Sequence, residues 1–142
     1  MKSVKDIMTS DVSVCRTDDC LSDAASLMKQ KNIGAVPVCD TQGNLMGMVT
    51  DRDLVIRGYA DKRPDSAPLQ QVMSDHLFHC TPECSLEEAS RIMAEHQVRR
   101  LPVVENGQLM GIISLGDLST EEMSDEAAGE ALQDISERPE LH

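Results

Sequence analysis

The most constraining feature of the sequence is an internal repeat. Residues 4–54 align with residues 69–118 with a single one-residue gap, so that Met8 matches Met73. Further matched pairs are Cys15 and Cys80, Leu21 and Leu86, Ala24 and Ala89, and Met28 and Met93. A solenoid usually needs about three or more units. We therefore expect two related halves that fold against each other about a pseudo-twofold axis.

Each copy predicts the element order β-α-β-β-α. In the first copy, residues 12–14, 35–38 and 45–50 are typical of strands, and residues 51–57 are typical of a short helix. A longer helix is expected after the first strand, because apolar residues recur there with the period of one helix face. The residues of this face are Leu21, Ala24, Ala25 and Met28.

Two local signals refine the strands. Pro37 cannot donate a backbone hydrogen bond, so its strand is expected at a sheet edge or to begin there. In the second copy, Asn106 and Gly107 predict a two-residue hairpin loop of type I′, because both positions favour a positive φ.

The expected fold class is α+β. The two repeats, residues 1–57 and 69–120, are joined by a linker at residues 58–68 and followed by an acidic helical tail at residues 121–142. Residues 119–142 contain eight acidic residues and one basic residue, so they carry −7 of the net charge of −12.

The composition disfavours several classes of partner. An acidic surface repels nucleic acids and anionic membranes, and Tyr59 and Phe78 are the only aromatic residues. The core is therefore expected to be aliphatic. No apolar run approaches the roughly 20 residues of a transmembrane helix, and residues 1–6 lack the apolar stretch of a signal peptide. We expect a cytoplasmic protein without nucleic-acid or membrane partners.

The cysteines leave an alternative open. Their odd number, five, argues against a disulfide framework. His76, His79, Cys80 and Cys84 lie close in the sequence, and a metal or redox site built on them is one interpretation. Zinc sites usually have closely spaced ligand pairs, and no Cys-x-x-Cys pair is present. The other interpretation is that Cys15 and Cys80 are small apolar strand residues.

Three pairs of segments carry a family resemblance. Each copy ends with glycine, two apolar residues, Thr or Ser, two variable positions and Asp. The matching segments are residues 4–8 and 69–73, 36–38 and 96–103, and 47–54 and 111–118. In this order, twice, they resemble a tandem pair of cystathionine β-synthase (CBS) domains over about residues 1–120. The resemblance implies a regulatory module that binds an adenosine-containing ligand, such as AMP, ADP, ATP, S-adenosylmethionine or NAD, and that pairs two chains.

The resemblance also implies a site in each repeat. Asp53 and Asp117 match the family's ribose-binding aspartate, and a carboxylate can accept hydrogen bonds from both vicinal hydroxyls of a ribose. Thr50 and Ser114 lie three residues earlier, where hydroxyl and helix N–H groups suit ribose or phosphate oxygens. An apolar slot for adenine is expected on the strand after the longer helix. The residues assigned to it are Ile33, Val36, Pro37, Val98 and Pro102.

Phosphate groups require cations. Arg99 and Arg100 precede the second slot, and the guanidinium fork suits phosphate. The first copy has Gly34 and Ala35 at these positions and offers Arg52 instead. We therefore expect two chemically unequal sites, with the second better equipped for a polyphosphate.

These patterns indicate a stand-alone, non-enzymatic module that binds an adenine nucleotide, requires no other cofactor and signals to a separate protein. A homodimer is expected, because the helix faces carry more aliphatic surface than one chain can cover. The residues of these faces are Leu21, Met28, Leu86, Ile92 and Met93. The alternatives are a ligand-free dimeric scaffold and the metal or redox sensor described above.

Overall fold

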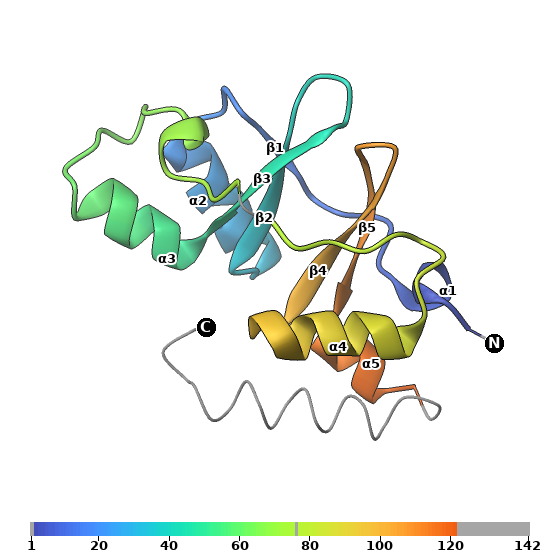
Figure 1. Ribbon diagram of the computed structural model, residues 1–142. Coiled ribbons are helices and arrows are strands. Elements are labelled where there is room, and N and C mark those ends of the chain that lie inside the picture. The colour runs from blue at the N-terminus through green and yellow to red at the C-terminus, as the bar shows by residue number, and fades with distance from the viewer. Residues whose placement is uncertain (1, 76, 122–142) are drawn as a thin grey trace. The chain divides into compact units, whose positions relative to one another are not determined.

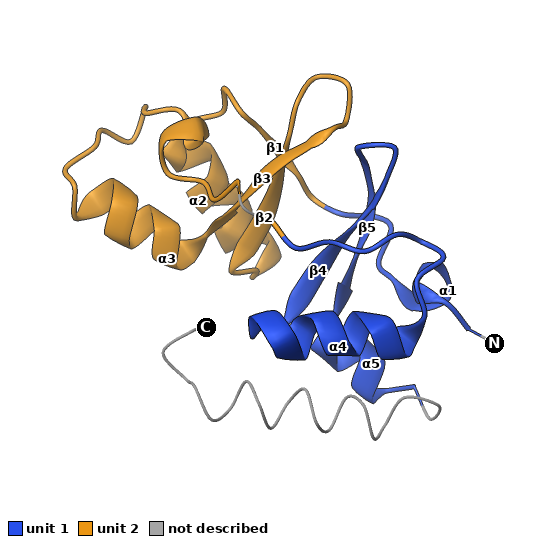
Figure 2. Cartoon of the chain, viewed as in Figure 1, with its two compact units in different colours: residues 1–12, 78–142 blue, residues 13–77 orange. Residues whose placement is uncertain are grey.

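The computed structural model describes residues 2–75 and 77–121 (Figure 1). The chain forms two compact units: a repeat-one unit of residues 13–77 and a repeat-two unit of residues 1–12 and 78–142 (orange and blue in Figure 2). Each unit combines helices with a small sheet, which confirms the expected fold class. The pseudo-twofold axis stays a prediction, and the expected tail lies outside the described residues beyond Glu121.

The repeat-one unit contains a three-stranded sheet in the order β1-β2-β3, with β1 parallel and β3 antiparallel to β2. Its elements are β1 (Cys15–Arg16), α2 (Leu21–Lys31), β2 (Ala35–Cys39), β3 (Leu45–Thr50), α3 (Asp51–Asp53), the π-helical η1 (Leu54–Tyr59) and the 3₁₀-helical η2 (Leu69–Gln71). The expected strand at residues 12–14 is wrong. Pairing with β2 begins at Cys15, and Val14 is 44% exposed.

The repeat-two unit follows the same plan. Its elements are α1 (Val4–Ile7), α4 (Leu86–His96), β4 (Arg100–Glu105), β5 (Gln108–Ser114) and α5 (Leu115–Ser119). Cys80 forms a single parallel bridge to Val103, in the place that β1 occupies in repeat one. The predicted type I′ hairpin loop is confirmed by the positive φ of Asn106 (54°) and Gly107 (82°).

The long helices bury the faces that their apolar period predicts, with one exception. Ala25 is exposed on α2. The buried residues are Leu21, Ala24 and Met28 of α2, and Leu86, Ala89, Ser90 and Met93 of α4. They pack into two aliphatic cores, one in each unit. In the part of the chain that the structure describes, no helix is long and apolar enough to cross a membrane.

Each core is completed by a segment from the other repeat of the sequence. Val4, near the start of the chain, is fully buried in the repeat-two core. Leu69 and Val72, from the opening of the second repeat, are fully buried in the repeat-one core. The backbone follows the same exchange, because Thr9 and Ile112 donate a hydrogen bond to each other, both at 2.9 Å. The compact units are therefore not continuous in sequence.

The exchanged segments also explain how strand β2 accommodates Pro37. Pro37 lies in the central strand β2 and not at its start, so the expectation of an edge position is wrong. Its partner on β3 is Met48, whose N–H and C=O bond with Ser74 at 2.9 and 2.8 Å. The Pro37–Met48 pair thus exchanges no ladder bond, and the missing N–H of proline leaves no acceptor on β3 unpaired.

Two glycines permit the close approach of these segments. A Cβ at Gly47 would lie 2.7 Å from Ser74 O, and a Cβ at Gly111 would lie 2.6 Å from Thr9 O. We expect Gly47→Ala and Gly111→Ala each to lower the free energy of unfolding by about 1–3 kcal/mol, because backbone must move to relieve the clash. Gly116→Ala is the control, since a Cβ at this position would lie 3.6 Å from Ser114 Oγ, an ordinary contact distance. Urea unfolding measures the effect, and equal midpoints for all three variants would contradict the prediction.

Candidate functional site

A reciprocal capping box closes the strand–helix junction of each repeat. In repeat one, Thr50 N donates to Asp53 Oδ2 at 2.9 Å, and Asp53 N donates to Thr50 Oγ1 at 3.0 Å. In repeat two, Ser114 N donates to Asp117 Oδ2 at 2.8 Å, and Asp117 N donates to Ser114 Oγ at 3.0 Å. The three-residue spacing brings these groups together because it joins the N-cap to the third helical position.

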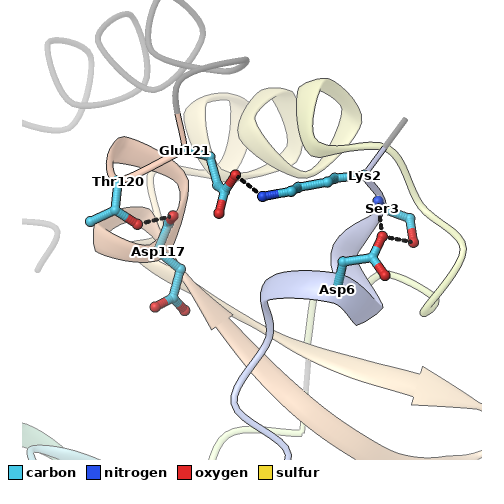
Figure 3. Close-up of polar contacts among 6 residues, drawn as sticks. All are labelled: Lys2, Ser3, Asp6, Asp117, Thr120 and Glu121. Carbon is cyan, nitrogen blue, oxygen red and sulfur yellow. Dashed lines mark hydrogen bonds and ion pairs between the residues drawn. The ribbon is translucent and has the colours of Figure 1, made fainter.

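The capping boxes use one carboxylate oxygen and leave the other available. Within residues 2–75 and 77–121, the hydrogen bonds of both aspartate side chains involve Oδ2 alone. Asp53 and Asp117 are half-buried. Figure 3 shows the Asp117 carboxylate directed away from Thr120, whose Oγ1 donates to the backbone O of Asp117 at 2.8 Å. A fixed carboxylate with an unused oxygen can accept hydrogen bonds from ligand hydroxyls.

In repeat two, the start of β4 meets the start of α5 at the same junction. Leu115 N donates to Arg99 O at 2.7 Å, and Arg100 pairs with Ser114 in the ladder of β4 and β5. The side chains of Arg99 and Arg100 are exposed. The junction therefore brings the backbone of two arginines to the strand end that carries the oriented carboxylate and the hydroxyl.

The repeat-one junction differs in charge. Here Asp51 N donates to Gly34 O at 2.9 Å, and a Cβ on Gly34 would lie only 3.3 Å from Asp51 Oδ2. Asp51 takes the position of the buried Leu115 in repeat two. An anion approaching this junction meets an additional carboxylate, and Arg52 is the exposed cation that the same turn offers. The two junctions are therefore unequal.

The residues expected to line the adenine slot differ in exposure. Ile33 is 37% exposed, and Val98 is half-buried. Val36, Pro37 and Pro102 are buried. The first two can therefore present side chains to a ligand, whereas the other three support the slot from beneath or contribute backbone.

Burial keeps the core cysteines in the thiol form. Desolvation raises the pKa of Cys15 to about 11 and the pKa of Cys80 to about 12. Burial also raises the pKa of Cys84. His76 is outside the described residues, and among those that are described no three His, Cys, Asp or Glu side chains gather as a metal site requires. Since the thiolate is the nucleophile, burial makes Cys15 and Cys80 poorly reactive thiols.

We expect thiol labelling at pH 7.5 to separate the cysteines. Cys15 and Cys80 should react at least about 100-fold more slowly in the folded protein than in the unfolded chain, because they are buried and their raised pKa values leave little thiolate. Cys20, which is partly exposed, should react first. Peptide mapping after timed alkylation measures the order, with protein in urea as the control. A folded-state rate for Cys80 that matches the urea rate would contradict this prediction.

Two features of the structure were not predictable from the sequence patterns. The rings of Phe78 and His96 stack in the repeat-two unit, with centroids 3.5 Å apart. Asp51 lies against Gly34 in the repeat-one unit. The signals available in the sequence were the single phenylalanine and the difference between Asp51 and Leu115 at matched positions.

Comparison with known proteins agrees with this architecture. The family model of the CBS domain matches residues 4–58 and 69–123. The CBS domain-containing protein YhcV of Bacillus subtilis is 50% identical over 136 residues, which are 96% of each chain. The crystal structure of Hypoxic Response Protein I (HRPI) with two coordinated zinc ions is 36% identical, with a TM-score of 0.77 over 84% of this chain and 98% of that one. The crystal structure of CBSX2 in complex with AMP is 27% identical, with a TM-score of 0.76 over 89% and 99%.

Two matched domains and two structural units of the same plan establish the identity of the chain at the level of its family. It belongs to the CBS domain family and contains a tandem pair of CBS domains. Tandem CBS domains are regulatory modules.

Proposed function

We propose that this CBS pair binds an adenine nucleotide, AMP, ADP or ATP, as a regulatory ligand and signals to a separate protein. The observation that carries the proposal is the repeat-two junction. There, among the described residues, the half-buried Asp117 carboxylate uses only one oxygen in hydrogen bonds, and the exposed Arg100 pairs through its backbone with Ser114 at the same strand end.

The chemistry of this junction suits the parts of a nucleotide. Asp117 Oδ1 accepts hydrogen bonds from ribose hydroxyls, and Ser114 Oγ offers a further partner. Arg99 and Arg100 bind the phosphates, for which a guanidinium is well shaped. S-adenosylmethionine carries a cationic sulfonium in place of phosphate, so the same arginines disfavour it.

A relative supports the ligand class. CBSX2, whose structure matches 89% of this chain, was crystallised in complex with AMP. The proposal extends that ligand to the present chain because its junctions contain the carboxylate, hydroxyl and cations that a nucleotide requires.

The proposed output is a change of conformation and not a reaction. A ligand shifts an equilibrium only by its differential affinity for two states. In this chain those states are two arrangements of the CBS pair, and the partner protein distinguishes them. The module performs no catalysis of its own.

Calorimetric titration of the full chain tests the proposal. We expect saturable binding of AMP, ADP or ATP, and weaker binding of S-adenosylmethionine under the same conditions. NAD is titrated in the same way as the remaining adenosine-containing candidate. The absence of heat and of any melting-temperature shift with all three adenine nucleotides would refute nucleotide binding and favour the scaffold alternative.

The proposal includes a homodimer with twofold symmetry, the commonest closed assembly. Of the five helix residues expected at its interface, Ile92 is half-buried and the others are buried in their own unit. The exposed apolar residues of η1 are therefore the better candidates. They are Val55 (54% exposed), Ile56 (49%) and Tyr59 (85%). Light scattering at micromolar concentration should give twice the chain mass of 15.6 kDa, and a strictly monomeric mass would contradict the prediction.

Zinc binding is a second candidate function, favoured by the two coordinated zinc ions of HRPI. In this chain its ligands would come from His76, His79, Cys80 and Cys84. Elemental analysis of protein purified without chelator tests it. Stoichiometric zinc that is lost in Cys84→Ser would establish the metal function, and protein without zinc after equilibration with the ion would exclude it.

A further inference from the structure

The repeat-two unit presents an exposed pair of stacked rings. Phe78 and His96 lie with their centroids 3.5 Å apart and their planes inclined by 8°. Phe78 is 45% exposed, and His96 is exposed as well. An aromatic pair in contact usually belongs to a core or an interface, yet both cores of this protein are aliphatic. The position of the pair therefore requires another explanation.

The stack lies at the edge of the unit that carries the Asp117 junction. Cys80 N donates to Pro102 O at 3.1 Å, and Cys80 bridges to Val103 in parallel. Phe78 precedes this bridge by two residues, and its ring contact with His96 places it near the connection from α4 to β4, the strand on which Arg100 pairs with Ser114. Neighbouring strands are about 4.8 Å apart, so on the order of 10 Å separates the backbone of Cys80 from that of β5 across β4. One nucleotide is long enough to cover this edge.

His96 reaches the same edge from the helix side. α4 ends at His96, and Gln97 turns the chain with a left-handed φ of 55°. Two residues later Arg99 begins the junction. The ring pair and the arginine pair are thus held by the same short connection between α4 and β4.

Repeat one has no such platform. The positions matched to Phe78 and His96 are Ser13 and Lys31. The same junction that lacks the arginine pair and carries Asp51 also lacks the rings. The two junctions therefore differ in three independent ways: the arginine pair, Asp51 and the ring pair. Each difference favours nucleotide binding at repeat two.

We infer that the Phe78–His96 stack is the base-recognition platform of the repeat-two site, on which the nucleobase of the ligand stacks as a further ring. This inference rests on the proposed function and deepens it, because it assigns recognition of the base to two residues outside the capping box, the arginine pair and the apolar slot. Stacking on aromatic side chains recognises the flat face of a base. The ligand is therefore a nucleotide that carries a base, bound mainly at repeat two.

Proton NMR of the full chain tests the inference directly. Phe78 is the single phenylalanine, and the chain has one tyrosine and no tryptophan, so the Phe78 ring signals are readily assigned. Saturating AMP should shift these signals upfield by ring-current effects and give cross-relaxation to H2 or H8 of the base. Ribose 5-phosphate, which has no base, should leave them in place.

Two variants measure the contribution of stacking as a change in the affinity for AMP. Phe78→Leu keeps an apolar side chain without a ring and should weaken AMP binding about tenfold, in line with the loss of one base–aromatic stack. Phe78→Tyr keeps the ring and should retain the affinity. Neither variant should alter the affinity for ribose 5-phosphate, which separates loss of stacking from a general disturbance of the site. Calorimetry supplies the constants.

The outcomes separate this inference from the proposed function. Wild-type protein that binds AMP with unmoved Phe78 signals, or with equal affinity in Phe78→Leu, overturns the platform and leaves nucleotide binding intact. Wild-type protein that binds no adenine nucleotide overturns the proposed function and the platform with it. Ring shifts with AMP and a selective loss in Phe78→Leu establish the assignment.

Discussion

Replacing Leu69 with alanine is expected to open the repeat-one unit, although Leu69 belongs to the second repeat of the sequence. Its side chain is fully buried in the repeat-one core, and its N–H donates to Asp19 O at 2.8 Å. Truncation of a buried leucine leaves a cavity and costs about 2–5 kcal/mol. Native-state hydrogen exchange should show the loss of protection first in β2 and β3, while β4 and β5 keep theirs.

Val4→Ala is the reciprocal control. Val4 is fully buried in the repeat-two core, so this variant should lower protection in β4 and β5. Its effect should be smaller, because fewer methyl and methylene groups are removed than from leucine. Loss of protection confined to β4 and β5 for Leu69→Ala would contradict the exchange of segments. Equal loss in both sheets would show instead that the two units unfold as one.

The exchange has a consequence for how the protein folds. A fragment cut at the repeat boundary, residues 1–57, lacks Leu69 and Val72 and retains Val4 without its core. Each repeat alone is already small for an independent core. The two repeats therefore stabilise each other through the chain segments that precede them, and neither sequence repeat is a complete structural unit.

The sequence predicted the repeated plan but not this exchange. Helix positions such as Leu21 and Leu86 followed from the apolar period, which depends on local geometry. Val4 and Leu69 occupy matched positions in the two repeats. The sequence pattern is compatible with either residue in either core. Which core each residue enters therefore depends on tertiary structure. The same limit applies to Pro37, whose central position is tolerated because Ser74 takes the hydrogen bonds of Met48.

In the candidate site, too, some features follow from local sequence and others depend on tertiary structure. The boxes at Asp53 and Asp117 join residues three positions apart, so their spacing was visible in the sequence. Phe78 and His96 are separated by the whole of α4, and their stacking depends on how the chain returns beside β4. No local pattern contains that information. The inequality of the two junctions was predictable from Arg99 and Arg100, while the contribution of Asp51 required its contact with Gly34.

The second large effect concerns ligand affinity. We expect Asp117→Ala and Arg100→Ala each to weaken AMP or ATP binding about tenfold or more, because each removes a charge-assisted hydrogen bond worth roughly 1.5–3 kcal/mol. Asp53→Ala should weaken binding less, since its junction lacks the arginine pair and carries Asp51. Calorimetric titration of the three variants measures the ranking.

The comparison of the two aspartates contains its own control for stability. Asp53 and Asp117 close equivalent capping boxes, with hydrogen bonds of 2.9 and 2.8 Å to the N-cap N–H, so each alanine variant loses the same kind of helix cap. A difference between them in affinity therefore reports the ligand and not the fold. Asp117→Glu extends this control, because glutamate also closes a capping box but displaces the second oxygen; it should keep the melting temperature and lose affinity. Equal losses in Asp53→Ala, Asp117→Ala and Arg100→Ala, or a larger loss in Asp53→Ala, would reverse the ranking and indicate that Arg52 holds the phosphates.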